Sequence, residues 1–215
     1  LNKSFEMIQE WYSTTLRNSK IYNNNKPENI SKAFTINDKN KGEKASDVIK
    51  HLRKHLLINS NFNPSPNYYG YITGGGNQVG VLGEFIKSAL NQNNLKWHSA
   101  PANTEIEKIV IKWIASFIGY KKDCGGVLVS GGSVANLMNM AVMRKVMGDK
   151  DISQTGLYNK NKMRVYVSSE AHSSIDKAMD VLGLGTQNLI KINIDENFKI
   201  NINELEKKIK NDIKN

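Results

Sequence analysis

Two glycines and a serine separate a short apolar run from a helical pattern in the stretch VLVSGGSVANLMNMAVMRKV, residues 127–146. Gly131 and Gly132 permit a sharp turn and let a ligand approach the backbone closely. The amides that follow would open at a helix N-terminus, where the helix dipole favours an anion, and the Ser133 hydroxyl adds a donor. The pattern predicts a phosphate or carboxylate site. A plain strand-to-helix turn is the alternative.

The turn does not have the spacing of the common nucleotide-binding motifs. A P-loop requires Gly-Lys followed by Ser or Thr, which is absent after Ser133. The dinucleotide fingerprint requires a third glycine, whereas Val134 and Ala135 stand here. The sequence therefore predicts an anion site without assigning a nucleotide to it.

The second candidate is His172, in the run YVSSEAHSSIDKA at residues 166–178. It follows the end of an expected strand, and Ser133 follows the end of another. Ligands of open α/β sheets bind at the carboxyl ends of strands, so we expect Ser133 and His172 to face one crevice. An imidazole there can stack on a flat ring or act as an acid or base. A histidine that only caps its own helix is the alternative.

The elements that would position these residues alternate between strand and helix. The third expected helix has Asn201 as its N-cap and Glu204 three residues on. Such alternation predicts an α/β domain with a mainly parallel sheet and flanking helices. The expected strand and helix pairs are 126–130 with 133–147, 163–168 with 173–183, and 188–194 with 202–212.

Two further helices are expected before these units. One covers residues 78–93, and Thr104 and Glu107 predict a capping box for the next. A loop rich in proline, tyrosine and glycine precedes both, which places a boundary near residue 75. We therefore expect a helical N-terminal segment, 1–75, and the first part of a larger α/β domain, 76–215. The apolar faces expected to point inward are Val79, Leu82, Phe85, Ile86 and Leu90, and Ile106, Ile109, Val110, Trp113, Ile114 and Phe117.

Composition excludes several classes of protein. The 215 residues carry a net charge of +10, but their basic residues are scattered and form no dense stripe, so we expect no nucleic-acid partner. No apolar run reaches the roughly 18 residues of a membrane span, and no signal-peptide core is present, so a cytoplasmic protein is expected. Cys124 is the single cysteine. His51 and His55 are four residues apart, but cationic neighbours and the absence of an intervening glutamate argue against a metal.

Four motifs, in order, resemble the group II pyridoxal-phosphate-dependent amino-acid decarboxylases. They are NYYGYITGGGNQVGVLGEFI, SAPANTEIEKIVIKWI, SGGSVANL and YVSSEAHSSIDKA. The resemblance implies part of the type I pyridoxal-phosphate fold, a homodimer, and pyridoxal 5'-phosphate as cofactor. It places the phosphate on Gly131, Gly132 and Ser133. It makes His172 the catalytic residue that stacks on the cofactor ring. The substrate loop falls on Tyr71, Thr73 and Gly74.

Departures from the family pattern bear on the substrate and on completeness. Glutamate decarboxylases carry glutamine where Tyr71 stands, which disfavours glutamate and slightly favours an aromatic L-amino acid. Val134 replaces a usual acidic residue, and Ile72, Thr73 and Gly74 replace a Phe-Pro-Thr run of the animal aromatic decarboxylases. The family's Schiff-base lysine and the aspartate that pairs with the ring nitrogen lie beyond Asn215, so the chain is expected to be an N-terminal part that is inactive alone. The alternatives are another pyridoxal-phosphate lyase, an aldehyde synthase or a non-catalytic truncated homologue.

Overall fold

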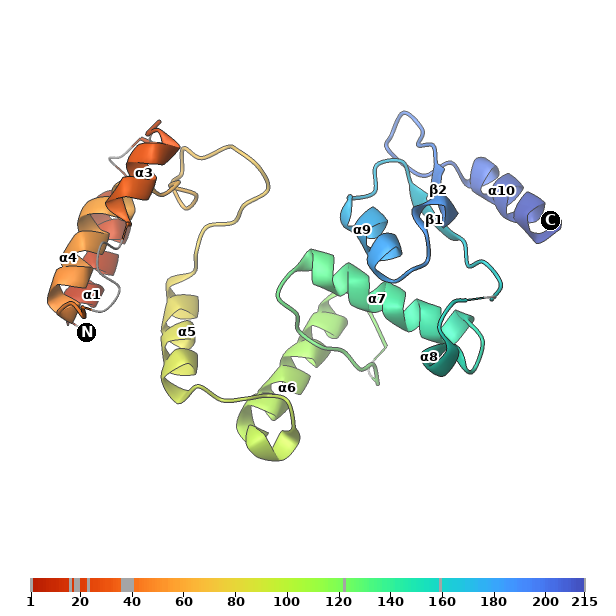
Figure 1. The fold of residues 1–215 in the computed structure, drawn as a ribbon, viewed down its shortest axis with the longest axis horizontal. Helices are drawn as coiled ribbons and strands as arrows, with labels where there is room; N and C mark the ends of the chain where they lie inside the picture. The colour runs from red at the N-terminus through yellow and green to blue at the C-terminus, as the bar shows by residue number, and fades with distance from the viewer. Residues whose placement is uncertain are drawn as a thin grey trace. The chain divides into compact units, whose positions relative to one another are not determined.

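Helices make up most of the two units into which the chain divides, Leu1–Gln92 and Asn93–Asn215 (Figure 1). The computed structural model describes residues 2–15, 17, 20–22, 24–35, 41–121, 123–158 and 160–214. Within the described residues no helix is long and apolar enough to cross a membrane.

The first unit is built around α1 (Asn2–Glu10) and α4 (Ala45–His55), which lie side by side (Figure 1). An ion pair between Arg53 and Glu10 joins the two helices. The Trp11 ring stacks on buried Phe62 at a centroid distance of 4.8 Å. The remaining elements are η1 (Trp11–Thr15), α3 (Pro27–Ala33), η2 (Leu57–Asn59) and α5 (Gln78–Leu90).

Helix α5 forms where the sequence predicts it, but its apolar face is not buried. The Asn77 side chain caps its start by accepting from two backbone amides, at 2.8 and 3.2 Å. Phe85 touches Phe5 edge-on at 5.8 Å. No described element of the first unit covers the rest of this face, so the prediction of inward-facing side chains is wrong for this structure. All five are exposed: Val79, Leu82, Phe85, Ile86 and Leu90.

In the second unit α6 (Pro101–Phe117) follows the short η3 (Trp97–Ser99) and begins earlier than expected. Pro101 occupies the first turn, where its fixed φ suits a helix and its missing amide costs nothing. The predicted capping box is therefore wrong. Thr104 lies inside the helix and donates to the Ala100 carbonyl at 2.8 Å. Most of the expected inward face is exposed as well: Ile106, Ile109, Trp113, Ile114 and Phe117.

The described sheet consists of β1 (Val165–Ser168) and β2 (Leu189–Ile192), which pair in parallel with Val165 opposite Leu189. These are two of the three expected strands. Residues 126–130 form no strand, because no described strand lies beside them to complete a ladder. The Leu128 amide donates instead to the Glu107 carboxylate of α6 at 2.9 Å.

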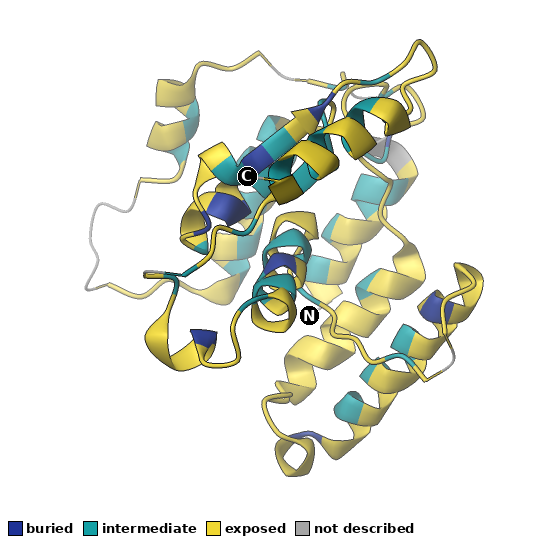
Figure 2. Ribbon diagram, turned by 90° about the vertical axis from the view of Figure 1, so that its right-hand side faces the viewer, coloured by how far each residue is buried: buried dark blue, intermediate teal, exposed yellow. Residues whose placement is uncertain are grey.

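The core of the second unit lies where α7 (Gly132–Met147) packs on α9 (Ser174–Val181), the helix between the two strands. Most of the remaining helical surface is exposed (Figure 2). The Arg144 guanidinium donates to the Leu182 carbonyl at 2.9 Å and so holds the end of α9 to α7. The buried cluster comprises Met140, Ala178, Met179, Leu184 and Leu189.

Three shorter or terminal elements complete the second unit: α8 (Ile152–Thr155), η4 (Thr186–Asn188) and α10 (Ile202–Lys214). The predicted cap of the last helix is confirmed, since Asn201 Oδ1 accepts from the Glu204 amide at 3.0 Å. The Glu204 carboxylate itself accepts from the Asn193 amide at 3.1 Å and pairs with Lys208 at 2.9 Å.

Candidate functional site

The glycine-serine turn lies at the start of α7, as the sequence predicts. The first helical hydrogen bond joins the Ala135 amide to the Gly131 carbonyl at 3.0 Å. Helix geometry therefore leaves the amides of residues 132–134 without partners inside the helix. A Cβ added at Gly131 or Gly132 would meet nothing within 4 Å. The Ser133 hydroxyl is exposed and has no hydrogen bond to a described residue. The turn thus presents several donors to open space.

His172 lies in the connection between β1 and α9, and its ring is exposed. Its Nδ1 accepts from the Ser174 amide at 3.1 Å and lies 2.9 Å from the Ser174 hydroxyl. The histidine therefore caps the first turn of its own helix, which was the alternative interpretation. Nε2 has no hydrogen bond to a described residue, so capping leaves one ring nitrogen and the ring faces for a ligand.

A side-chain contact that the sequence analysis missed joins the two candidates. Asn136, one turn beyond Ser133 on α7, donates to the buried Ser174 hydroxyl at 2.8 Å. The sequence offers only a weak signal for this contact: Asn136 is three residues after Ser133, and Ser174 is two residues after His172. The structure therefore brings the start of α7 and His172 into one neighbourhood.

A small apolar pocket of about 160 Å³ lies beside this contact. Both Ser133 and Ser174 line it, which again puts the turn and the start of α9 together. Lys177 is the only cationic side chain among its lining residues, which also include Ser133 of the turn. The lining residues are Ser133, Val134, Leu137, Ser174, Lys177, Ala178 and Val181.

The predicted substrate loop belongs to the other unit. Tyr71, Thr73 and Gly74 are exposed residues of the first unit, between η2 and α5. Tyr71 has a φ of 58°, the left-handed region that disfavours a bulky side chain, and is 91% exposed. A non-glycine residue with this backbone is a marker of function or strain.

His51 and His55 of α4 have ring centroids 4.6 Å apart, with the two ring planes tilted by 36°. Burial, the neighbouring His51 and Lys54 together lower the pKa of His55 from its usual 6.5. The described residues contain no group of three or more histidine, cysteine or carboxylate side chains placed to hold a metal. The Phe34 ring lies edge-on to His51 at a centroid distance of 5.8 Å.

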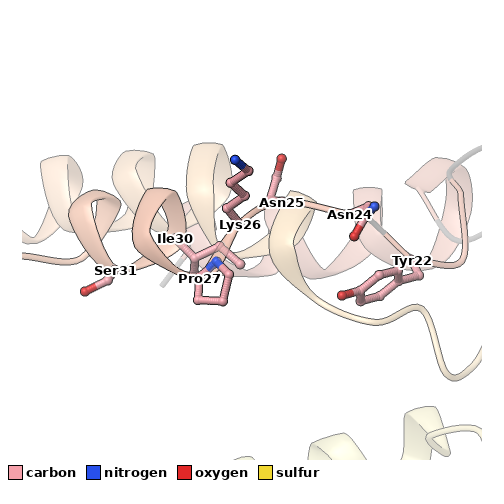
Figure 3. Close-up of a pocket in the computed structure, with 7 residues that line it drawn as sticks. All are labelled: Tyr22, Asn24, Asn25, Lys26, Pro27, Ile30 and Ser31. Carbon is pink, nitrogen blue, oxygen red and sulfur yellow. The ribbon is translucent and has the colours of Figure 1, made fainter.

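A larger hollow of about 700 Å³ opens near the start of α3. Lys26 and Asn25 project to one side of the chain there, and Tyr22 to the other (Figure 3). Its polar groups do not converge on one point, and it contains no histidine, cysteine or carboxylate. The hollow is lined by Tyr22, Asn24, Asn25, Lys26, Pro27, Ile30 and Ser31.

The geometry of the second unit suits a ligand with an anionic group and a flat ring. The open amides and the Ser133 hydroxyl match a phosphate, for which a helix N-terminus alone contributes only about 0.3–1 kcal/mol at an exposed position. The exposed His172 ring can lie against a planar group. These are features of a protein that binds a phosphorylated aromatic cofactor on an α/β unit.

The chain belongs to the family of the pyridoxal-dependent decarboxylase conserved domain, whose model matches residues 27–215. The resemblance read from the sequence is thereby confirmed, as is the pyridoxal cofactor at the level of the family. It is 29% identical to an aromatic-L-amino-acid decarboxylase of Bacillus atrophaeus over 80% of this chain and 34% of that protein. It is 32% identical to a tyrosine decarboxylase of Papaver somniferum over 69% and 31%. It is 28% identical to an acidic amino acid decarboxylase of Xenopus tropicalis over 92% and 38%. The chain thus spans about a third of the length of these relatives.

Solved structures show the same fold. The apo form of mouse CSAD superposes with a TM-score of 0.89 at 23% identity, covering 97% of this chain and 44% of that one. The 4-hydroxyphenylacetaldehyde synthase of Rhodiola rosea superposes with a TM-score of 0.85 at 25% identity, covering 99% and 46%. The Catharanthus roseus tryptophan decarboxylase, solved in complex with L-tryptophan, has a TM-score of 0.86 at 22% identity. These neighbours confirm the type I fold expected from the sequence in outline.

Proposed function

We propose that this chain supplies the phosphate-binding part of a pyridoxal-phosphate-dependent L-amino-acid decarboxylase. The observation that carries the proposal is the junction of α7 and α9. Open anion donors begin one helix, an exposed histidine caps the next, and Asn136 and Ser174 join the two at 2.8 Å. A phosphate on the turn and a flat ring beside the imidazole satisfy both features at once.

Each residue of the junction has a separate role in this proposal. Gly131 and Gly132 let the phosphate approach the backbone amides, and Ser133 donates its hydroxyl to a phosphate oxygen. His172 stacks against the pyridine ring and touches the substrate, so it is the catalytic residue of this part of the chain. The bound cofactor supplies the electron sink that accepts the pair left when carbon dioxide departs. This chain's residues bind and orient it.

The substrate is proposed to be an L-amino acid, with the aromatic type slightly favoured and glutamate disfavoured. Tyr71, Thr73 and Gly74 are proposed to contribute to the substrate pocket, and Tyr71 stands where glutamate decarboxylases carry glutamine. The relatives include both aromatic and acidic amino-acid decarboxylases. Separate assays of aromatic, glutamate and aspartate substrates on the intact protein test this preference. Turnover of glutamate above that of tyrosine would contradict it.

An aldehyde synthase is the second candidate function. Relatives at 27% identity include a phenylacetaldehyde synthase of a Rosa hybrid cultivar, and a solved neighbour is an aldehyde synthase of Rhodiola rosea. The two activities differ in their organic product. A primary amine supports the decarboxylase, and an aldehyde supports the synthase.

We further propose a cytoplasmic homodimer as the working form of the intact protein.

The 215 residues contain no His-Lys pair, the context in which the family carries its Schiff-base lysine. By themselves they are therefore expected to bind the cofactor without turning substrate over. A non-catalytic homologue remains the alternative, and carbon dioxide release by the intact protein would exclude it.

Cofactor binding is tested most directly with a pair of ligands, pyridoxal 5'-phosphate and pyridoxal. Titration calorimetry on the chain is expected to show tighter binding of the phosphorylated ligand. Ser133→Ala should remove about tenfold of that preference, the lower end of what a hydrogen bond to a charged group provides. Ser116→Ala, an exposed serine of α6, is the matched control and should leave the preference unchanged. Equal binding of the two ligands by the unmodified chain would overturn the assignment of the turn.

His172 has a different expected signature. His172→Ala in the intact enzyme should reduce turnover more than it reduces cofactor affinity, because stacking orients the ring while the turn holds the phosphate. A loss of affinity as large as the loss of turnover would instead make the histidine a simple binding residue.

A further inference from the structure

The hydrogen bonds around His172 form a chain whose direction is determined by one backbone amide. The Ser174 amide lies 3.1 Å from Nδ1 of His172, and an amide N–H can only donate. Nδ1 of this ring must therefore be the unprotonated, accepting nitrogen. This conclusion does not depend on the placement of any side-chain hydrogen.

The rest of the chain follows from that first bond. The Ser174 hydroxyl is 2.9 Å from the same Nδ1, so it must donate to it as well. Having donated its single hydrogen, the hydroxyl oxygen accepts from its other neighbour. That neighbour is Asn136, 2.8 Å away, which must present its NH₂ group. The donors thus run from Asn136 through Ser174 to His172.

We propose that Asn136 and Ser174 are positioning residues that hold neutral His172 as the tautomer protonated at Nε2. In that form the ring points an N–H donor away from α9, on the side where no described residue bonds it. The same chain ties the imidazole to α7, one turn beyond Ser133. The orientation of the stacking ring is thereby linked to the helix that binds the phosphate. The functional consequence rests on the proposed function, but the tautomer does not.

The hydrogen bonds between Asn136, Ser174 and His172 meet at a buried residue, Ser174. Ser174 is only 3% exposed and lies at the first position of α9, beside buried Ala178. A buried hydroxyl that loses its hydrogen-bond partners is left unsatisfied, which costs free energy. Keeping both bonds of the Ser174 hydroxyl is therefore favoured. Because α7 and α9 pack on each other through the core, neither Asn136 nor His172 can turn away from Ser174 independently.

Nitrogen-15 NMR of the 215-residue chain, at alkaline pH where imidazoles are neutral, measures the tautomer directly. His172 is expected to show a pyridine-type Nδ1 and a pyrrole-type Nε2. His98, an exposed imidazole of the same unit, is the internal reference and reports free tautomer exchange. Ser174→Ala should lower the ratio of Nε2–H to Nδ1–H at His172 by about two- to tenfold, the range of one neutral hydrogen bond.

Asn136→Asp is the sharper variant because it keeps size and shape but replaces the donor with an acceptor. The Ser174 hydroxyl should then donate to the new carboxylate and present its lone pairs to Nδ1, so the Nδ1–H form of His172 should rise. Asn136→Leu, which removes the donor without adding an acceptor, should give a smaller change in the same direction. Ser174→Thr retains a hydroxyl and should restore the ratio lost in Ser174→Ala. The amide spectrum of each variant shows whether the α7–α9 packing is retained.

Two results would overturn the proposal: an Nδ1–H tautomer in the unmodified chain, or an unchanged ratio at His172 in both Asn136→Asp and Ser174→Ala. None of these measurements involves the cofactor. Failure of the tautomer experiment with intact discrimination between pyridoxal 5'-phosphate and pyridoxal would refute the positioning chain alone. If the tautomer results are as expected but the two ligands bind equally, the cofactor assignment is refuted. The hydrogen bonds from Asn136 through Ser174 to His172 are then still supported.

Discussion

Asp212 anchors the C-terminal part of α10 to β1, and removing its carboxylate should loosen that part of the helix. Asp212 accepts from the Tyr166 hydroxyl at 2.6 Å and forms an ion pair with Arg164, next to the start of the strand. Its side chain is 19% exposed, so these contacts are partly shielded from water. An isolated helix of 13 residues is marginal in water, and α10 therefore depends on such tertiary contacts.

The expected cost of Asp212→Ala is about 2–3 kcal/mol of local stability. A hydrogen bond to a charged acceptor contributes about 1.5–3 kcal/mol. The ion pair adds about 0.2–1 kcal/mol, because the Arg164 side chain is 39% exposed and water screens it. Amide hydrogen exchange in the C-terminal part of α10 should accelerate by about 30- to 160-fold. Exchange in α7 should change much less, since α7 packs mainly on α9.

Glu206→Ala is the matched control on the same helix. Glu206 pairs with Lys210 at 3.3 Å, and both side chains are well exposed, so its loss should cost less than about 0.5 kcal/mol. Tyr166→Phe removes only the hydrogen bond and should give most of the Asp212→Ala effect. The double variant should then cost little more than Asp212→Ala alone. Additive losses in the double variant, or equal exchange in Asp212→Ala and Glu206→Ala, would refute this account of the anchor.

Three other outcomes follow from local geometry and charge. Gly148→Ala should lower unfolding stability in urea by about 1–3 kcal/mol, because its Cβ would lie 2.6 Å from a carbonyl oxygen and 2.6 Å from a methyl carbon; Gly125→Ala, which enters open space, should not. The hydrogen bond from Lys208 lowers the pKa of Glu204 from 4.5. The Glu204 carboxylate therefore stabilises α10 fully above pH 4.5, and this contribution is lost as the pH falls through the lowered pKa. In a pH titration of amide exchange along α10, Glu204→Gln should remove this pH dependence. The lowered pKa of His55 has the same sign, so α4 should lose stability as the pH falls below 6.5, and His55→Gln should abolish that loss in exchange measurements on α4.

The helices could be predicted from the sequence because their signals are local. The apolar spacing and the glycine turn predicted α7, and Asn201 predicted the cap of α10; each signal lies within one or two turns of the element it specifies. The capping box at Thr104 failed for a local reason too. Pro101 is the stronger start signal, since its fixed φ begins the helix one turn earlier.

Burial and sheet formation depend on partners that are distant in the sequence. The apolar periodicity of α5 and α6 correctly predicted helices but not buried faces, because a face is buried only when another element covers it. Residues 126–130 have a strand-like composition, yet a strand also needs a neighbour to share its hydrogen bonds. β1 and β2 pair in parallel although a helix separates them in the sequence, whereas the Leu128 amide donates to the Glu107 carboxylate.

The sequence by itself indicated which residues to propose for the candidate site, and the tertiary structure decided how they are connected. Gly131, Gly132, Ser133 and His172 were identifiable because their types and their positions after apolar runs carry chemical meaning. The roles of Asn136 and Ser174 were not, because the bond between them joins residues 38 positions apart. Only the packing of α7 on α9 brings those two side chains together, and with them the direction in which the His172 ring presents its proton.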